Sequence, residues 1–98
     1  MAYSLTWSPA ARFDLSDLSA YIAEYNPVAA AGFVRSIFIV IERLPAFPES
    51  GRVVPEFGDA TLREVIRKPC RIVYRIRPEN EQIEIARIWH AARGVPKI

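Results

Sequence analysis

Two dipeptides, Ser8-Pro9 and Asn26-Pro27, constrain the first half of this chain more than any other feature. Serine and asparagine are favoured helix N-caps, and proline suits the first helical position because its missing N–H is not needed there. Apolar residues then recur at helical spacing, which predicts one helix over about residues 9–25 and a second from residue 27 to about residue 44. Because almost no linker separates them, the two helices should form an antiparallel hairpin.

The second predicted helix contains "IFIVI" at residues 37–41, which is apolar all the way round. A helix of this kind is usually buried on two sides, here between its partner helix and a sheet. An exposed patch that binds a partner protein is the alternative interpretation.

Four segments have the composition of strands. "AYSLTW" opens the chain, and a proline-rich loop at residues 44–61 precedes "LREVI", "RIVYRIR" and "QIEIARIW". The short links "RKPC" and "PENE" favour an antiparallel meander, whereas a loop as long as residues 44–61 tends to be functional or mobile. We therefore expect a single α+β domain over residues 1–98, with elements in the order β-α-α-β-β-β. An N-terminal two-helix hairpin should pack on one face of an antiparallel sheet.

Arginine alternates with apolar residues in "RIVYRIR", so its side chains should divide between the two faces of the sheet. The apolar side chains of Ile72, Tyr74 and Ile76 should face the helices. The side chains of Arg71, Arg75 and Arg77 should lie on the opposite face, which is open to solvent. Residues 51–98 hold ten basic and six acidic side chains, and eight of the ten are arginine, the cation suited to bidentate contacts with carboxylate or phosphate. An anionic partner is one interpretation, and a solvated face without a ligand is the other.

Several classes of function lack their sequence signals. No apolar run is long enough for a membrane span, and the first residues do not resemble a signal peptide, so we expect a cytoplasmic protein without a membrane partner. One cysteine, Cys70, and one histidine, His90, make a structural zinc site or an internal disulfide unexpected. Without a phosphate-binding glycine loop or a nucleophile elbow, we expect no cofactor and no metal.

General acid–base cleavage of RNA needs a proton acceptor, a proton donor and a cation that stabilises the charged phosphate. Glu56 in the proline-rich loop, Arg71 and His90 could fill these roles if the sheet brings them together. The simpler interpretation makes Glu56 a loop carboxylate that pairs with an arginine, and His90 a strand-end residue hydrogen-bonded to the backbone. Tyr74 and Trp89 are expected to pack in the core.

The order and spacing of "DLSAYIAEYNPVAAAGFV", "LPAFPESGRVVPEF" and "REV…P…RIVYRI…IEIARIWHAAR…P" resemble the RelE/ParE superfamily of toxins from type II toxin–antitoxin modules. The resemblance covers nearly the whole chain. It implies the fold expected above and a cognate antitoxin, often acidic, that neutralises the toxin in a hetero-oligomer. The residues expected to meet the antitoxin or the target are Arg63, Arg71, Arg75, Arg77, Arg87 and Arg93.

The superfamily divides by target, into ribosome-dependent messenger RNA endoribonucleases and inhibitors of DNA gyrase. The stretches "HAARGVP" and "LREVIRKP" look closer to the ParE branch, which implies growth inhibition through gyrase and a role in plasmid stabilisation. The alternative is a metal-independent endoribonuclease acting on the ribosome and its message, in which Glu56, Arg71 and His90 match the catalytic positions. Ribonuclease members that use lysines and a C-terminal tyrosine are matched less well, because Ala91 follows His90. A third interpretation is an inactive basic module that only pairs with a partner protein.

Overall fold

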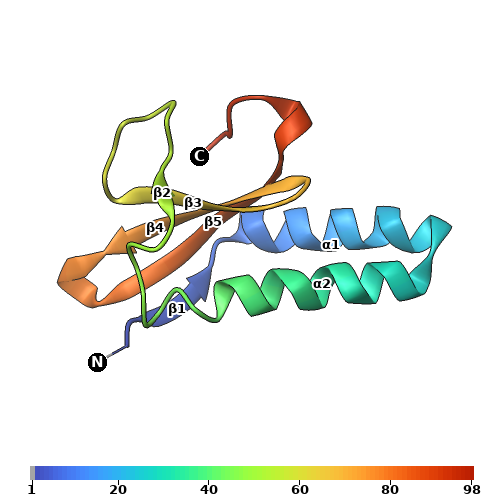
Figure 1. The fold of residues 1–98 in the computed structure, drawn as a ribbon, viewed down its shortest axis with the longest axis horizontal. Coiled ribbons are helices and arrows are strands. Elements are labelled where there is room, and N and C mark those ends of the chain that lie inside the picture. The colour runs from blue at the N-terminus through green and yellow to red at the C-terminus, as the bar shows by residue number, and fades with distance from the viewer. Residues whose placement is uncertain (1) are drawn as a thin grey trace.

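The computed structural model describes residues 2–98, and it confirms the predicted fold class. Two helices and five strands occur in the order β1 (Ser4–Trp7), α1 (Pro9–Tyr25), α2 (Pro27–Ile41), β2 (Arg52–Val53), β3 (Leu62–Arg67), β4 (Cys70–Arg77) and β5 (Gln82–His90). Short 3-10 turns at Pro78–Asn80 and Ala91–Arg93 follow β4 and β5. The helices lie side by side against one face of the sheet, while the loop containing β2 and the C-terminal tail lie on its other side (Figure 1).

The sheet has the strand order β1-β5-β4-β3-β2. All neighbouring strands are antiparallel except β1, which pairs in parallel with β5 from Ser4↔Gln82 to Trp7↔Ile85. The parallel pairing follows from topology, because the helical hairpin carries the chain away from β1 and the sheet is then completed by sequential hairpins. A shift of register between Val73 and Tyr74 marks an irregularity in the β4–β5 pairing.

Both helices begin where the cap signals predicted. The Ser8 Oγ accepts the Ala11 N–H at 3.0 Å, and the Asn26 Oδ1 accepts the Ala29 N–H at 3.1 Å. The second helix ends at Ile41, a few residues short of the predicted end, because the following residues form turns. Within residues 2–98, neither helix is both long and apolar enough to cross a membrane.

The main core lies between the helices and the sheet. The apolar side chains of β4 face this core as predicted, and they pack with residues from both helices and β5: Ala11, Phe33, Ile37, Ile41, Leu44, Cys70, Ile72, Tyr74, Ile76, Ile83, Ile85 and Ile88. Alternation in β4 thus determined which of its residues are buried under the helices.

A second, smaller cluster lies on the other face of the sheet. It consists of Val54, Leu62, Val73 and Ala86, and it is covered by the proline-rich loop of residues 44–61. Within this loop, Arg52 and Val53 form the two-residue strand β2, which the sequence did not predict. The loop is held in place, since the Tyr74 Oη accepts the Gly51 N–H at 2.9 Å and donates to the Pro48 carbonyl at 2.7 Å. This face is therefore only partly open to solvent.

The apolar segment of α2 is only partly buried. Ile37 and Ile41 are fully buried, whereas Phe38 and Ile39 are 42% and 50% exposed. The helix packs against α1 and the sheet as expected, but these two neighbours do not cover its full circumference, so Phe38 and Ile39 stay exposed. The alternative interpretation, an exposed patch, describes the position of Phe38 and Ile39.

Candidate functional site

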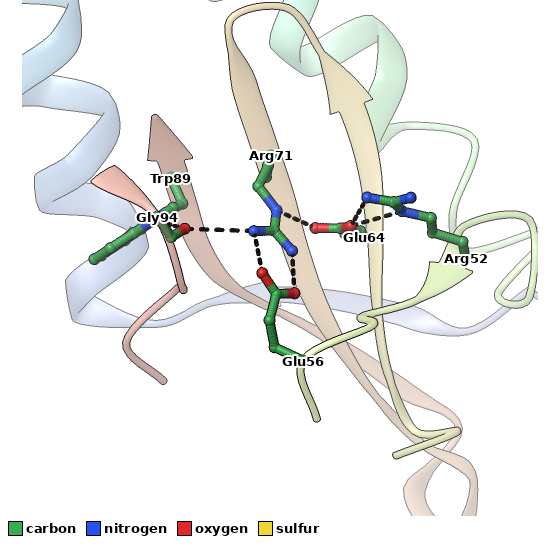
Figure 2. A network of polar contacts seen from close by, with 6 residues as sticks. All are labelled: Arg52, Glu56, Glu64, Arg71, Trp89 and Gly94. Atoms are coloured by element: carbon green, nitrogen blue, oxygen red, sulfur yellow. Dashed lines mark hydrogen bonds and ion pairs between the residues drawn. The ribbon is translucent and has the colours of Figure 1, made fainter. Parts of the chain in front are cut away.

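Arg71 occupies the centre of the candidate site, near the start of β4. Its Nε donates to the Glu64 Oε1 at 2.6 Å, and its two terminal nitrogens donate to the Glu56 carboxylate at 2.8 and 2.7 Å. Figure 2 shows the Arg71 guanidinium between these two carboxylates. Arg71 lies on the face away from the helices, as predicted, but it is buried, with only 9% of its surface exposed. The expectation of a solvated Arg71 was wrong because the loop at residues 44–61 folds over it.

Glu64 is a central residue of this site that the sequence analysis did not single out. Its side chain is fully buried, and its Oε2 also accepts from the Nε and Nη2 of Arg52, both at 2.7 Å. Glu56, Arg71, Glu64 and Arg52 form a row of alternating charges, here called the Arg71 network, whose formal charges cancel. The signal for Glu64 was present in the tight "RKPC" link, because a short hairpin fixes the β3–β4 register and places Glu64 opposite Val73.

The network shifts the titration of its outermost carboxylate. The hydrogen bonds from Arg71 lower the pKa of Glu56 from 4.5 to about 2, so Glu56 is ionised at any physiological pH. The same hydrogen bonds, together with those to Glu64, raise the pKa of Arg71 above its already high ordinary value. Both charges are therefore permanent and mutually neutralised.

The C-terminal tail reaches the same site through Gly94. Its carbonyl oxygen accepts from the Trp89 Nε1 at 3.1 Å and from the Arg71 Nη1 at 3.4 Å (Figure 2). Trp89 is buried as predicted, and the guanidinium groups of Arg93 and Arg87 lie 4.0 and 4.7 Å from its ring centroid. Cation–π contacts of this kind help to hold the tail on the sheet. Arg71 thus connects the proline-rich loop, the sheet and the tail.

His90 ends β5 and adopts the simpler of its two predicted roles. Its Nδ1 accepts the Ala92 N–H at 3.1 Å, which caps the short turn Ala91–Arg93. His90 also lines a hollow of about 490 Å³ together with Glu56 and Arg71. The fold therefore brings the three candidate catalytic residues to one hollow, although Glu56 and Arg71 are bound to each other.

The other arginines expected to meet a partner are largely engaged within the chain. Arg63 donates to the Gly51 and Ala60 carbonyls, each at 3.0 Å. Ion pairs join Arg75 to Asp59 at 3.8 Å and Arg77 to Glu84 at 3.2 Å. Most of these arginines already have intramolecular partners, and their role in binding stays a prediction.

Arg87 forms a buried ion pair at the edge of the sheet. Its Nε and Nη2 donate to the two carboxylate oxygens of Asp14 in α1, at 2.8 and 2.9 Å, and these bonds raise the pKa of Arg87. Asp14 also accepts the Ile88 N–H at 3.0 Å. The sequence did not identify this pair, because Asp14 lies off the apolar face predicted for its helix.

Comparison with known proteins identifies the fold and the family. The family model for the ParE toxin of the type II toxin–antitoxin system, parDE, matches residues 5–95. The Toxin RelE2 of Caulobacter vibrioides is 32% identical over 89 residues, which cover 91% of this chain and 96% of the relative.

Two solved structures share the fold. The chromosomal ParDE toxin–antitoxin system from P. aeruginosa gives a TM-score of 0.72 at 24% identity, covering 91% of this chain and 96% of that chain. The toxin–antitoxin complex RelBE2 from Mycobacterium tuberculosis gives 0.57 at 24% identity, covering 92% and 99%. The fold is that of the RelE/ParE toxins. More narrowly, the chain belongs to the ParE toxin family of type II toxin–antitoxin systems.

Proposed function

We propose that this toxin arrests bacterial growth by inhibiting DNA gyrase, and that a small cognate antitoxin neutralises it in a hetero-oligomeric complex in the cytoplasm. The observation that carries the proposal is the match to the ParE toxin model over residues 5–95. It is supported by a site whose charged residues are paired in a way that does not suit proton transfer.

The state of Glu56 disfavours RNA cleavage. A general base works best when its pKa lies near the pH at which the enzyme operates. The Glu56 carboxylate has a pKa of about 2, because Arg71 donates two hydrogen bonds to it. A carboxylate held in this way is a weak base at neutral pH. An inhibitor that acts by binding needs no such base.

The state of Arg71 leads to the same conclusion. Its Nε and both terminal nitrogens donate to protein acceptors, namely Glu64, Glu56 and the Gly94 carbonyl. To stabilise a charged phosphate, Arg71 would have to exchange these bonds for new ones. The pair with Glu64 is buried and therefore costly to break. The pair with Glu56 is partly exposed, but its two hydrogen bonds occupy the terminal nitrogens that a phosphate would need.

The second candidate function is the ribosome-dependent endoribonuclease, with Glu56 as base, Arg71 stabilising the phosphate and His90 as acid. Two observations favour it: the three residues line one hollow, and a relative carries the name Toxin RelE2. This mechanism requires Glu56 to leave Arg71 when RNA binds.

The antitoxin is proposed by analogy with two structures of the same fold, which are a ParDE toxin–antitoxin system and a RelBE2 toxin–antitoxin complex. Among the arginines predicted to meet it, Arg93 and Arg77 are the most available. Arg93 is exposed above Trp89, and Arg77 has a half-exposed side chain.

The deciding experiment is induced expression of the chain alone, with DNA synthesis and protein synthesis followed separately. Gyrase inhibition predicts that DNA synthesis stops and DNA-damage signalling rises while translation continues, and that the purified toxin blocks supercoiling by purified gyrase. Translation that stops first, with cleaved ribosome-bound message, would overturn the gyrase proposal in favour of the ribonuclease. Growth without arrest would favour the third interpretation, in which the chain is an inactive basic module that only pairs with a partner protein.

The variant His90→Ala distinguishes gyrase inhibition from RNA cleavage in the same expression experiment. Under gyrase inhibition it still arrests growth, because His90 caps a turn and transfers no proton. Under RNA cleavage it abolishes arrest, since loss of one acid–base group typically costs about 10²–10⁴ in rate. Co-expression with the product of the neighbouring antitoxin reading frame should restore growth in either case and serves as the control for toxicity.

A further inference from the structure

Strand β3 is longer than the strand that covers its outer edge. β2 pairs with only two of its residues, in the register Arg52↔Glu64 and Val53↔Arg63. β3 continues for three residues beyond Glu64 and ends at Arg67. β4 pairs with this extension on its inner side, but no strand of the described chain pairs with its outer edge.

The pairing with β4 shows which main-chain groups point outward. The Ile76 N–H donates to the Thr61 carbonyl at 2.7 Å, so Thr61 is in a hydrogen-bonded pair with β4. Main-chain groups alternate along an antiparallel strand, so every second residue after Thr61 also bonds to β4. Leu62, Glu64 and Ile66 therefore direct their N–H and C=O groups toward the outer edge.

Within residues 2–98, Leu62 and Glu64 have main-chain partners on the outer edge and Ile66 does not. The Leu62 carbonyl accepts the Val54 N–H at 3.1 Å, and Glu64 pairs with Arg52. Ile66 pairs with Arg71 of β4 on the inner side, and on its outer side no strand of residues 2–98 pairs with it. Ile66 is also 47% exposed.

The core explains why β2 stops before it reaches Ile66. In a continued register, Ser50 would lie opposite Ile66. Instead, the chain at residues 48–51 turns away from the edge of β3, because the Tyr74 Oη forms hydrogen bonds with both the Gly51 N–H and the Pro48 carbonyl. The place beside Ile66 is thus left open by a fixed feature of the fold.

Two hollows flank this open edge, one on each face of the sheet, and Ile66 lines both. The hollow on the helix side has a volume of about 390 Å³ and is largely apolar, with one cation: Val40, Arg43, Leu44, Phe47, Ser50, Val65 and Ile66. The hollow on the opposite face carries Arg52 and Lys68 at its rim. Neither Arg43 nor Lys68 forms an ion pair with another residue of the described chain.

We propose that an extended, acidic segment of the antitoxin binds here by adding a short strand to β3 at Ile66. The main-chain groups of Ile66 pair with the incoming backbone, as in other cases of strand addition. Because neighbouring side chains of a strand point to opposite faces, an apolar residue of the segment enters the hollow against α2 while a carboxylate on the adjacent residue meets Lys68. The proposal rests on the proposed antitoxin and specifies where and how it binds.

A second copy of this chain is the wrong occupant for the edge. Pairing of two such edges would bring Arg43, Arg52 and Lys68 close to the same cations of the other copy. Like charges across paired strands are destabilising, and edge cations are a common protection against self-association. The same cations attract an acidic strand.

The first test measures amide hydrogen exchange of the toxin alone and of the toxin purified with the antitoxin encoded beside it. Strand addition predicts that the Ile66 amide exchanges at least about tenfold more slowly in the complex. The Val65 and Arg67 amides, which already bond to β4, should change much less. Equal exchange at Ile66 in both states would overturn the edge proposal, as would a toxin that dimerises alone with Ile66 protected.

The second test reverses single charges and measures antitoxin affinity. Lys68→Glu and Arg43→Glu should each weaken binding by about tenfold or more, since a rim charge would then repel the acidic segment. Arg35→Glu is the matched control, because Arg35 is exposed on α2 and lines neither hollow, and it should stay within about twofold of the native affinity. Equal losses in all three variants would indicate a general charge effect and overturn the site.

The two proposals fail in different ways. If co-expression restores growth while Ile66 stays unprotected, the antitoxin binds elsewhere and only the edge proposal is lost. If co-expression does not restore growth and no complex forms, the proposed antitoxin is lost, and the edge proposal fails with it.

Discussion

The Nε of Arg71 lies 2.6 Å from the Oε1 of Glu64, whose side chain is fully buried. The alternation of arginine and apolar residues in β4 predicted that Arg71 is a surface cation, but Arg71 forms an ion pair in the interior. The pair links the two central hairpin strands, while Glu56 extends it to the proline-rich loop. Stability and function therefore compete for the same residue, and variants of Arg71 test folding before they test binding.

Arg71→Ala should lower the free energy of unfolding by about 3–5 kcal/mol, because it leaves the buried carboxylate of Glu64 with Arg52 as its sole ion-pair partner among residues 2–98. Urea denaturation at neutral pH measures the change. Arg77→Ala is the control on the same strand: its pair with Glu84 is partly exposed, and the loss should stay below about 1 kcal/mol. Equal effects of the two substitutions would contradict the structural role of Arg71.

Glu56→Gln should reduce stability at neutral pH but not in strong acid. The folded-state pKa of Glu56 is about 2, lowered from 4.5, so the contribution of its charge is fully present above about pH 4.5 and disappears as the pH falls through 2. The denaturation midpoints of native protein and variant should therefore converge between those two values. Glu24→Gln, at an exposed carboxylate of α1 that forms no ion pair within residues 2–98, should leave the midpoint unchanged throughout.

Gly51→Ala should destabilise the protein by at least about 1–3 kcal/mol. A Cβ at this position would lie 2.6 Å from the Tyr74 Oη and 2.7 Å from the Glu64 carbonyl oxygen, and the second is main chain that cannot rotate away. Gly32→Ala is the matched control in α2, where an added Cβ meets nothing within 4 Å. It should raise stability, because alanine is favoured over glycine in helices by about 1 kcal/mol. Thermal melting of both variants gives the comparison, and a destabilised Gly32→Ala would contradict it.

Asp14→Ala should cost about 3 kcal/mol or more, because it leaves the largely buried Arg87 side chain without its carboxylate and the Ile88 N–H without an acceptor. Asp17→Ala, one turn further along the same helix at an exposed position, gains the same helix propensity without losing these bonds. The difference between the two in chemical denaturation isolates the contact of α1 with β5. A difference near zero would show that this pair adds nothing to stability.

The local elements of this fold were accessible from the sequence. The two capping dipeptides predicted where the helices begin, and the alternation in β4 identified the residues that face them. These signals depend on backbone preferences and on periodicity within a few residues, so they persist whatever the tertiary context. The structure places Glu56, Arg71 and His90 around one hollow, and their catalytic role stays a prediction.

What only the tertiary structure decided is the environment of those residues. The path of residues 44–61, the short strand β2 and the register of β3 against β4 bury Arg71 between two carboxylates, and the same path leaves Ile66 at an open edge. Asp14 and Arg87, 73 residues apart, meet only because α1 packs along β5. Contacts between distant residues depend on how loops close and strands align, and no local propensity encodes them. The sequence by itself therefore determined the elements and the inner face of the sheet, whereas the assembled fold determined which charges are free.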